Sequence, residues 1–205
     1  MMQTQKTDIR KVILEVAKTE FFEKGFKNAS MRNIAKKSGV GLSNIYNYFK
    51  NKNEIYVEVL SPLLNTFNNL LNEHNDNKHI SLDIFSSEEY TQKQVDMFIN
   101  LIIPFKKELK LLLFQSYGSS LENFKDEFTD KHTDLGLKYI QKMKEKYPQI
   151  NNNISYFFIH TISSWWLSII GEIATHDELS NEDIEVFIAE YMAFGTAGWR
   201  KLMQV

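Results

Sequence analysis

Cysteine is absent from this chain of 205 residues, which excludes disulfide bonds, thiolate metal sites and a cysteine nucleophile. A chain without cysteine fits a reducing compartment such as the cytosol. Proline and glycine are scarce, with three and eight residues respectively. Because no stretch alternates strictly between apolar and polar side chains, this scarcity favours long helices over strands. We therefore predict an all-α fold.

Signals for export and for membrane insertion are also weak. Residues 1–10 are polar and charged, without the apolar stretch and small-residue cleavage site of a secretory signal. Residues 149–171 carry no Lys, Arg, Asp or Glu over a length that could cross a bilayer of roughly 30 Å. Their Asn, Ser, Thr and His side chains would all need partners in lipid. We expect a buried or subunit-interface helix there, and a cytoplasmic protein with no membrane partner.

The sequence lacks recognisable signatures of catalysis and cofactor binding. No glycine-rich phosphate loop is present, and paired carboxylates such as Glu88 and Glu89 are better explained as helix-start charges. The histidines show neither metal-ligand spacing nor a nucleophile motif; they are His74, His79, His132, His160 and His176. We predict no enzyme activity, no cofactor and no metal.

Helix-start and helix-stop residues divide the chain into about nine expected helices. Thr7 or Asp8 caps the first helix, and Gly25 stops it. Ser180 and Asp183 form a capping box before the last helix. The expected helices cover residues 7–24, 30–37, 42–48, 52–71, 87–103, 104–117, 120–147, 150–176 and 181–203, with a polar loop at 72–87.

The small net charge of −2 hides an asymmetry along the chain. Residues 1–60 carry 11 Lys or Arg against 6 Asp or Glu, while the remainder carries 13 against 20. A basic first segment before an acidic remainder suggests that the first segment meets a polyanion. Chance clustering of solvated charges gives the same counts, so a motif has to decide between the two explanations.

Residues 31–48 have the spacing of a helix-turn-helix. Ile34 and Ile45 are placed to hold the inner faces of two short helices together. Ala35 is small where the helices cross, and Gly39 suits the sharp turn between them. Because the pattern lies in the basic segment after a three-turn amphipathic helix, it favours DNA binding over an ordinary helical hairpin.

The run SGVGLSNIYNYFKNKNEIY at residues 38–56, with most of residues 7–60 around it, resembles the amino-terminal domain of TetR-type transcriptional regulators. The resemblance implies a homodimeric all-helical repressor that binds double-stranded DNA at a palindromic operator. It also implies that the remainder of the chain dimerises and binds a small-molecule effector that lowers operator affinity. We accordingly divide the chain into a helix-turn-helix DNA-binding domain, residues 1–52, and an effector-binding and dimerisation domain, residues 53–205.

The recognition helix of this motif has an unusual composition. Residues 41–49 contain no Lys, Arg, Asp or Glu, so base reading would use Leu42, Ser43, Asn44 and Asn47. Asparagine pairs well with adenine edges, and an apolar side chain can contact a thymine methyl group. This composition predicts a half-site that leans toward A·T. Arg32, on the preceding helix, is the nearby side chain suited to guanine.

Phosphate contacts would position the protein on DNA without reading its sequence. The candidates are Lys27, Ser30, Tyr46, Tyr48, Lys50 and Lys52. The family resemblance implies DNA contacts at four of them, namely Ser30, Tyr46, Tyr48 and Lys52. For Tyr48 a place in the small core is an equal alternative, whereas Ile45 and Phe49 are assigned to that core.

Aromatic residues are concentrated after residue 60, where 20 of the 27 lie. With methionines such as Met97 they could line an adaptable pocket for a largely apolar or aromatic effector, or form plain core. His160, in the middle of an apolar helix, is expected first of all to be a hydrogen-bonded core residue. The pocket candidates are Phe98, Phe105, Phe114, Tyr117, Tyr139, Phe158, His160 and Trp165.

The last expected helix carries small residues on one side. Ala189, Ala193 and Ala197 lie at successive four-residue steps, with Gly198 close by, so another backbone can approach closely. With Trp166 of the preceding helix they form a candidate dimer interface, although tight packing within one subunit would look the same. A dimer is favoured because two recognition helices on a palindrome require one.

A different class of protein remains compatible with these patterns. The chain could be a helical small-molecule-binding or enzymatic protein whose basic amino-terminal segment is incidental. Salt-dependent binding to a palindromic DNA would separate the two classes.

Overall fold

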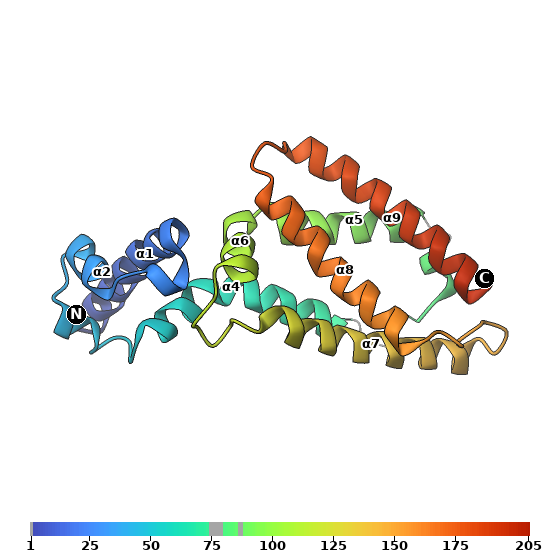
Figure 1. Ribbon diagram of the computed structural model, residues 1–205, viewed down its shortest axis with the longest axis horizontal. Helices are drawn as coiled ribbons and strands as arrows, with labels where there is room; N and C mark the ends of the chain where they lie inside the picture. The colour runs from blue at the N-terminus through green and yellow to red at the C-terminus, as the bar shows by residue number, and fades with distance from the viewer. Residues whose placement is uncertain (1, 74–79, 86–87) are drawn as a thin grey trace. The chain divides into compact units, whose positions relative to one another are not determined.

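The computed structural model describes residues 2–73, 80–85 and 88–205. Over these ranges the chain forms helices and no strand, which confirms the all-α prediction (Figure 1). Ser87, expected to open a helix, lies outside the described residues, as do His74 and His79. The elements are α1 (Met2–Asn28), α2 (Met31–Ser38), α3 (Leu42–Ile45), α4 (Lys52–Glu73), the 3-10 helix η2 (Leu82–Phe85), α5 (Glu88–Ile102), α6 (Lys106–Phe114), α7 (Phe124–Lys146), α8 (Tyr156–Thr175) and α9 (Asn181–Met203).

The chain folds into two compact units, and each unit is built from two separate stretches of the sequence. The amino-terminal unit comprises Met1–Asn65 and Lys107–Phe124, so it includes nearly all of α6. The carboxy-terminal unit comprises Thr66–Lys106 and Lys125–Val205. Helix α4 contributes residues to both units. The functional boundary expected between residues 52 and 53 concerns DNA contact rather than packing, and it stays a prediction.

Helix α1 differs from its prediction at its start. It begins at Met2 rather than at a Thr7 or Asp8 cap, because the polar residues before Thr7 contain no helix breaker. The regular helix is interrupted at Gly25, as predicted, with φ 68° and ψ 174°, and a short helical stretch continues to Asn28. A Cβ atom on Gly25 would lie 3.1 Å from the Cβ atom of Gln115. Positive φ and this close approach both require glycine.

Helix α2 begins and ends as its sequence predicts. The Ser30 hydroxyl accepts a hydrogen bond from the Asn33 backbone amide, which confirms Ser30 as the N-cap. Gly39 adopts φ 69° after the helix and supplies the sharp turn. Helix α3 is shorter than the predicted 42–48, because bonds of the i to i+3 type replace helical ones beyond Ile45.

The core of the amino-terminal unit is built around one aromatic cluster. Phe21 and Tyr56 meet edge to face, with ring centroids 5.0 Å apart, and Phe26 lies 4.9 Å from Tyr56. The Tyr56 hydroxyl lies 2.7 Å from the Ser116 hydroxyl, which ties the segment after α6 to this core. Other completely or nearly completely buried residues of this unit are Ile13, Ala17, Ile34, Ile45, Phe49 and Ile55.

Helix α4 contains a proline inside its length. Pro62 has no backbone N–H to donate to the carbonyl of Glu58, one turn earlier. The Ser61 hydroxyl donates to that carbonyl instead, at 2.8 Å. The helix therefore passes the proline with the Glu58 carbonyl still hydrogen-bonded.

In the carboxy-terminal unit, α9 confirms its predicted start and capping box. The Ser180 hydroxyl accepts from the Asp183 backbone amide, and the Asp183 carboxylate accepts from the Ser180 amide. Helix α5 packs against α9 and α8. Helix α8 begins at Tyr156 rather than Ile150, because Ser155 caps it by accepting from the Phe158 amide. Ile150 lies in a buried apolar cluster instead.

Two further boundaries correct the prediction. Helix α6 begins at Lys106, so Pro104 lies in the turn before it rather than in its first turn. Helix α7 begins at Phe124 rather than Ser120, since the Ser120 backbone amide donates to the Asn53 side chain at 2.8 Å.

Helix α8 is the one described helix long and apolar enough to cross a membrane by length and composition. Half of its apolar window is buried within the fold. Burial of this kind is expected of the core helix of a packed bundle.

Candidate nucleic-acid interface and ligand pocket

The α2-turn-α3 motif presents a polar surface on an apolar base. Ile45 is completely buried beneath α3, while Ser43, Asn44 and Asn47 are exposed. The Asn47 side-chain amide donates to the Asn44 side-chain oxygen at 2.9 Å. Tyr46 is exposed over half of its surface. The motif thus offers two amides, a hydroxyl and a phenol to solvent on one side of a fixed helix.

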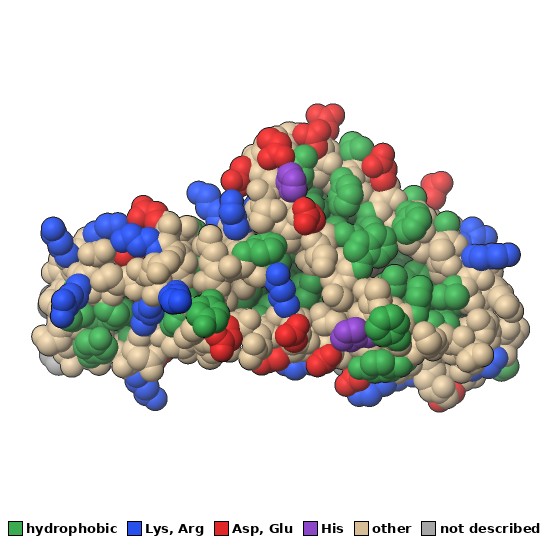
Figure 2. All heavy atoms as spheres, in the orientation of Figure 1, with side chains coloured by type: hydrophobic (Ala, Val, Ile, Leu, Met, Phe, Trp, Pro, Cys, Tyr) green, Lys and Arg blue, Asp and Glu red, His purple; other side chains and the backbone are tan. Residues whose placement is uncertain are grey.

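The remaining candidates for base and phosphate contact differ in exposure. Arg32 and Lys50 are exposed, whereas Leu42 and Tyr48 are half-buried. Lys27 is exposed and its Nζ atom lies 4.9 Å from the ring centroid of Tyr117, a cation–π contact. Their roles on DNA stay predictions. In Figure 2, Lys and Arg side chains are spread over α1 and α2.

Lys52 is placed differently from the other cations. Its Nζ atom donates to the backbone carbonyls of Phe26, Lys27 and Ala29 at 2.7, 3.3 and 3.2 Å. It also lies 4.4 Å from the centroid of the Phe26 ring. Burial lowers the pKa of the Lys52 ammonium. All three of its hydrogens are directed at the end of α1, which gives Lys52 a structural role whether or not it meets a phosphate.

A buried carboxylate that sequence reasoning missed holds α1 to α2. Glu20 is completely buried, and its Oε1 atom accepts from Lys24 Nζ at 2.7 Å, Asn33 Nδ2 at 3.2 Å and the Ser30 amide at 3.3 Å. Its Oε2 atom accepts from Lys37 Nζ at 3.3 Å. Burial raises the pKa of Glu20, but these hydrogen bonds outweigh it and lower the pKa to about 2.

The position of Glu20 in the sequence carried a signal. It lies three residues after Ala17 and seven after Ile13, on the apolar stripe of α1 that faces the core. A carboxylate on such a stripe has to be paired, and the candidates for its partners follow within 17 residues.

Comparisons with known proteins agree with this geometry. The family model "Bacterial regulatory proteins, tetR family" matches residues 13–59. An HTH-type transcriptional regulator of Staphylococcus aureus (strain bovine RF122 / ET3-1) is 28% identical over 148 residues, 67% of this chain and 80% of the relative. The HTH-type regulator YhgD of Bacillus subtilis (strain 168) is 42% identical over 57 residues, 28% of this chain and 30% of the relative. Residues 13–59 thus match the DNA-binding domain of the tetR family, and the chain is similar to HTH-type transcriptional regulators.

Solved structures extend the likeness in fold to the whole chain. NalD, described as the secondary repressor of the MexAB-OprM multidrug efflux pump in Pseudomonas aeruginosa, matches with a TM-score of 0.66 at 15% identity, covering 97% of this chain and 98% of NalD. The fatty acid degradation regulator FadR of Bacillus halodurans matches with a TM-score of 0.56 at 16% identity, covering 90% and 94%. The relatives are regulators, not enzymes, which speaks against the enzymatic alternative.

The carboxy-terminal unit contains a cavity of about 270 Å³. Of the predicted pocket residues, Phe98 and Tyr139 line it, and so does Met97. Trp166, predicted at a dimer interface, is buried and also lines it. The other predicted pocket residues lie away from this cavity; they are Phe105, Phe114, Tyr117, Phe158, His160 and Trp165.

Helical spacing explains the lining residues that sequence reasoning missed. Tyr191, Gly195 and Trp199 follow at four-residue steps along α9 and all face the cavity. On α7, His132 and Gly136 show the same spacing and face the cavity with Tyr139. A small residue between two large rings on one helix face marks space for a ligand, and this signal was available in the sequence.

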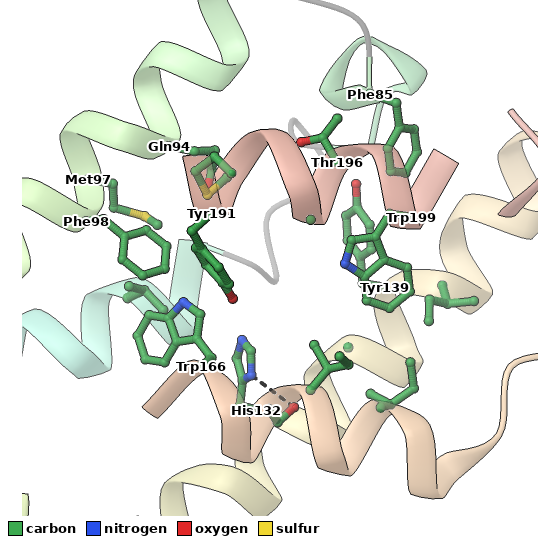
Figure 3. Close-up of a pocket in the computed structure, with 18 of the residues that line it drawn as sticks. Phe85, Gln94, Met97, Phe98, His132, Tyr139, Trp166, Tyr191, Thr196 and Trp199 are labelled. Carbon is green, nitrogen blue, oxygen red and sulfur yellow. Dashed lines mark hydrogen bonds between the residues drawn. The ribbon is translucent and has the colours of Figure 1, made fainter. Parts of the chain in front are cut away.

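Polar groups in the cavity are few and well defined. The Nδ1 atom of His132 lies 3.1 Å from the Ser163 hydroxyl (Figure 3). Its imidazole packs against both Phe128 and Trp166, with ring centroids 5.8 and 5.6 Å away, and these two rings also stack on each other. Burial raises the pKa of Tyr191 to about 12, so its hydroxyl is protonated at neutral pH. Burial also raises the pKa of Tyr139.

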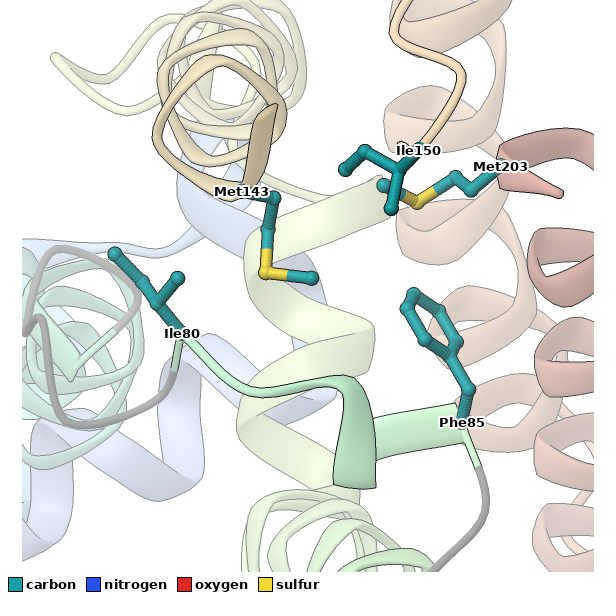
Figure 4. Close-up of a cluster of buried hydrophobic side chains, with 5 residues drawn as sticks. All are labelled: Ile80, Phe85, Met143, Ile150 and Met203. Atoms are coloured by element: carbon teal, nitrogen blue, oxygen red, sulfur yellow. The ribbon is translucent and has the colours of Figure 1, made fainter. Parts of the chain in front are cut away.

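One end of the cavity is continuous with a buried apolar cluster. Phe85 of η2 and Met203 of α9 line the cavity and also pack with Ile80, Met143 and Ile150 (Figure 4). The short helix η2, within a segment expected to be loop, therefore contributes to the pocket.

The structure also corrects the expectation that His160 is a hydrogen-bonded core histidine. This side chain is partly exposed, and its Nδ1 atom has no hydrogen-bond partner among the described residues. Its Nδ1 atom lies 3.8 Å from the Asp130 carboxylate, and its ring stacks on Tyr156. Within the described part of the chain, no group of three or more His, Asp or Glu is arranged to hold a metal ion.

Proposed function

We propose that this chain is a cytoplasmic homodimeric repressor of the TetR family that a small-molecule effector releases from a palindromic operator. The observation that carries the proposal is the exposed polar row of α3 above the buried Ile45. A helix that is anchored below and polar above has the arrangement that major-groove reading needs.

In the proposed complex, Asn44 and Asn47 read adenine edges while Ser43 and Leu42 adjoin them. The hydrogen bond between the two asparagines supports their acting together, because it fixes the orientation of both amides. Tyr46, Lys27 and Lys50 contact phosphate, as does Ser30 at the start of α2. Arg32 reaches guanine at the edge of the half-site. Lys52 acts mainly by fixing the end of α1, and Tyr48 by filling the edge of the core.

The proposed dimer interface is the exposed side of α8 and α9. Ala189, Ala193, Ala197 and Gly198 are all exposed, and Phe194 beside them exposes two thirds of its surface. Figure 2 shows hydrophobic side chains gathered over these two helices. An exposed apolar patch of this kind on a soluble regulator fits a subunit interface.

The effector would act through α4. Leu70 of α4 lines the cavity, and residues 52–65 of the same helix belong to the amino-terminal unit. A ligand that prefers one position of α4 would change the separation of the two recognition helices of the dimer. Operator affinity falls only if the preferred position cannot span the operator.

The test is selection of bound sequences from random duplex DNA with the purified regulator, at two salt concentrations. We expect one palindromic motif with A·T-rich contacted positions, lost in an Asn44→Ala/Tyr46→Ala variant. An Asn53→Ala variant, altered on α4 outside the reading surface, serves as the matched control and should recover the same motif. Recovery of no motif, or of one without two-fold symmetry, would contradict the proposal.

A further inference from the structure

The cavity of the carboxy-terminal unit has room for a small ligand. A dry protein cavity of roughly 150 Å³ holds one benzene molecule. At about 270 Å³ the cavity of this regulator has space for one or two fused rings with a short substituent.

Its walls are aromatic on two opposite sides. Phe98, Trp166 and Tyr191 stand on one side of the central space, and Phe85, Tyr139 and Trp199 on the other (Figure 3). Ring faces and edges at such spacing favour offset-stacked and edge-to-face contacts with an aromatic ligand. Flexible Met97 and Met192 fill the remaining lining and can adjust to its outline.

The lining carries no formal charge other than what His132 can acquire. None of the described residues that line the cavity is Asp, Glu, Lys or Arg. A charged ligand would leave water without meeting an opposite charge, which is unfavourable in an apolar site. The raised pKa of Tyr191 reports the same environment, because burial there disfavours a charged phenolate.

Two polar groups are aimed into this space. The Tyr191 hydroxyl and the His132 imidazole both point toward the centre (Figure 3). Among the described residues no hydrogen bond to the Tyr191 hydroxyl is formed, whereas Ser163 holds His132 through its Nδ1 atom. This hydroxyl of the half-buried Tyr191 can therefore donate to an acceptor that a ligand supplies.

We propose that the cavity binds an uncharged aromatic compound of one or two rings whose hydrogen-bond acceptor, such as a carbonyl oxygen, meets the Tyr191 hydroxyl. The inference rests on the proposed function only for its regulatory meaning, since the compound would be the effector. Binding itself can be measured without DNA.

Four naphthalenes of nearly the same shape test the ligand class, by equilibrium dialysis against the full chain at pH 7. They are 2-acetylnaphthalene, 2-ethylnaphthalene, the 2-naphthoate anion and the 2-naphthylmethylammonium cation. We expect one 2-acetylnaphthalene per chain, bound at least about ten-fold more tightly than either ion. An ion that binds as tightly as the ketone, or no binding by any of the four, overturns the assignment.

A variant without the Tyr191 hydroxyl tests its role in binding. Tyr191→Phe should weaken 2-acetylnaphthalene binding by about five-fold and leave 2-ethylnaphthalene within about two-fold, since it removes only the donor. Tyr156→Phe, an exposed tyrosine outside the cavity, is the matched control and should change neither. An unchanged ratio of ketone to hydrocarbon affinity in Tyr191→Phe would contradict the role of the hydroxyl.

Gly195→Leu places a side chain in open space on the cavity side of α9, since no atom lies within 4 Å of the position of its Cβ. It should abolish binding of the ketone and the hydrocarbon with an unchanged circular dichroism spectrum. Retained binding in this variant would place the ligand elsewhere and overturn the site.

A parallel measurement separates this inference from the proposed function. The selected duplex is bound to the regulator and titrated with 2-acetylnaphthalene. Ketone binding with no release of DNA supports the ligand class and contradicts effector gating. Failure of the duplex selection contradicts the DNA-binding proposal, while dialysis still decides the ligand class.

Discussion

The Nζ atom of Lys52 lies 2.7 Å from the backbone carbonyl oxygen of Phe26, where α1 ends. Because two further carbonyls share the ammonium, replacing Lys52 by methionine leaves three acceptors without this donor. We expect Lys52→Met to lower the free energy of unfolding by about 1–2 kcal/mol, measured by urea denaturation.

Lys50→Met is the control for Lys52→Met. The Lys50 side chain is exposed, so its removal should leave stability within about 0.5 kcal/mol. If Lys50 binds a phosphate, this variant should instead weaken the salt dependence of DNA binding. The slope of the logarithm of the binding constant against the logarithm of the salt concentration should become less negative by about one for the phosphate that Lys50 neutralises. Equal stability of the two variants would contradict the structural role of Lys52.

Glu20 makes stability depend on pH in a defined direction. Its pKa falls from an ordinary 4.5 to about 2 in the folded chain, so the unfolded state binds more protons between these values. Its contribution of about 3 kcal/mol is present above pH 5 and is lost as the pH falls toward 2. We expect Glu20→Gln to destabilise strongly at pH 7 and progressively less in acid, by denaturation at several pH values.

Glu23→Gln is the matched change for Glu20→Gln. Glu23 is exposed on the same helix and lies 3.5 Å from Lys37, so its ion pair contributes little. The free energy of unfolding of Glu20→Gln should approach that of the unmodified chain in acid. If the difference between the two does not shrink, the ionised carboxylate is not the source of the effect.

Two glycines with positive φ differ in ψ and in crowding. Gly39 has φ 69° and ψ 12°, in the left-handed helical region, whereas Gly25 has φ 68° and ψ 174°, a region open essentially to glycine alone. Of the two, Gly25 also has neighbours within 4 Å of its missing Cβ atom. We expect Gly39→Ala to cost about 1 kcal/mol and Gly25→Ala at least about 1 kcal/mol more, by thermal denaturation. Equal costs would contradict the added strain and crowding at Gly25.

A charge on the outer side of α9 tests the proposed dimer. Ala193→Glu places a carboxylate in the centre of the exposed apolar side, and we expect it to give monomers in analytical ultracentrifugation. Asp134→Lys, a charge change on the exposed side of α7, should leave the dimer intact. A variant Ala193→Glu that sediments like the unmodified protein would refute the interface.

The elements with strong local signals were predictable from the sequence. The capping box at Ser180 and the N-cap at Ser30 depend on neighbours within four residues, and both were found. The start of α7 depends on a contact distant in sequence, that between Ser120 and Asn53, and it was misplaced. Local propensity does not contain such contacts.

The same distinction holds for the sites. The exposed row of α3 follows from helical spacing around Ile45. The cavity combines side chains from six elements, so aromatic content alone identified only Phe98 and Tyr139 among its predicted lining. The hydrogen bonds of Lys52 were likewise invisible before the fold brought distant residues together.

Helix α9 also limits how the regulator can acquire a new specificity. Tyr191, Gly195 and Trp199 face the cavity, while Ala193 and Ala197 on the same helix are exposed on its other side. A substitution that shifts or rotates α9 to admit a different compound would disturb the outer side as well. Gln94 and Met97 of α5 also line the cavity, but substitutions there do not alter the exposed outer side of α9. Under the proposed function, laboratory evolution toward new effectors should therefore accumulate changes on α5 earlier than on α9.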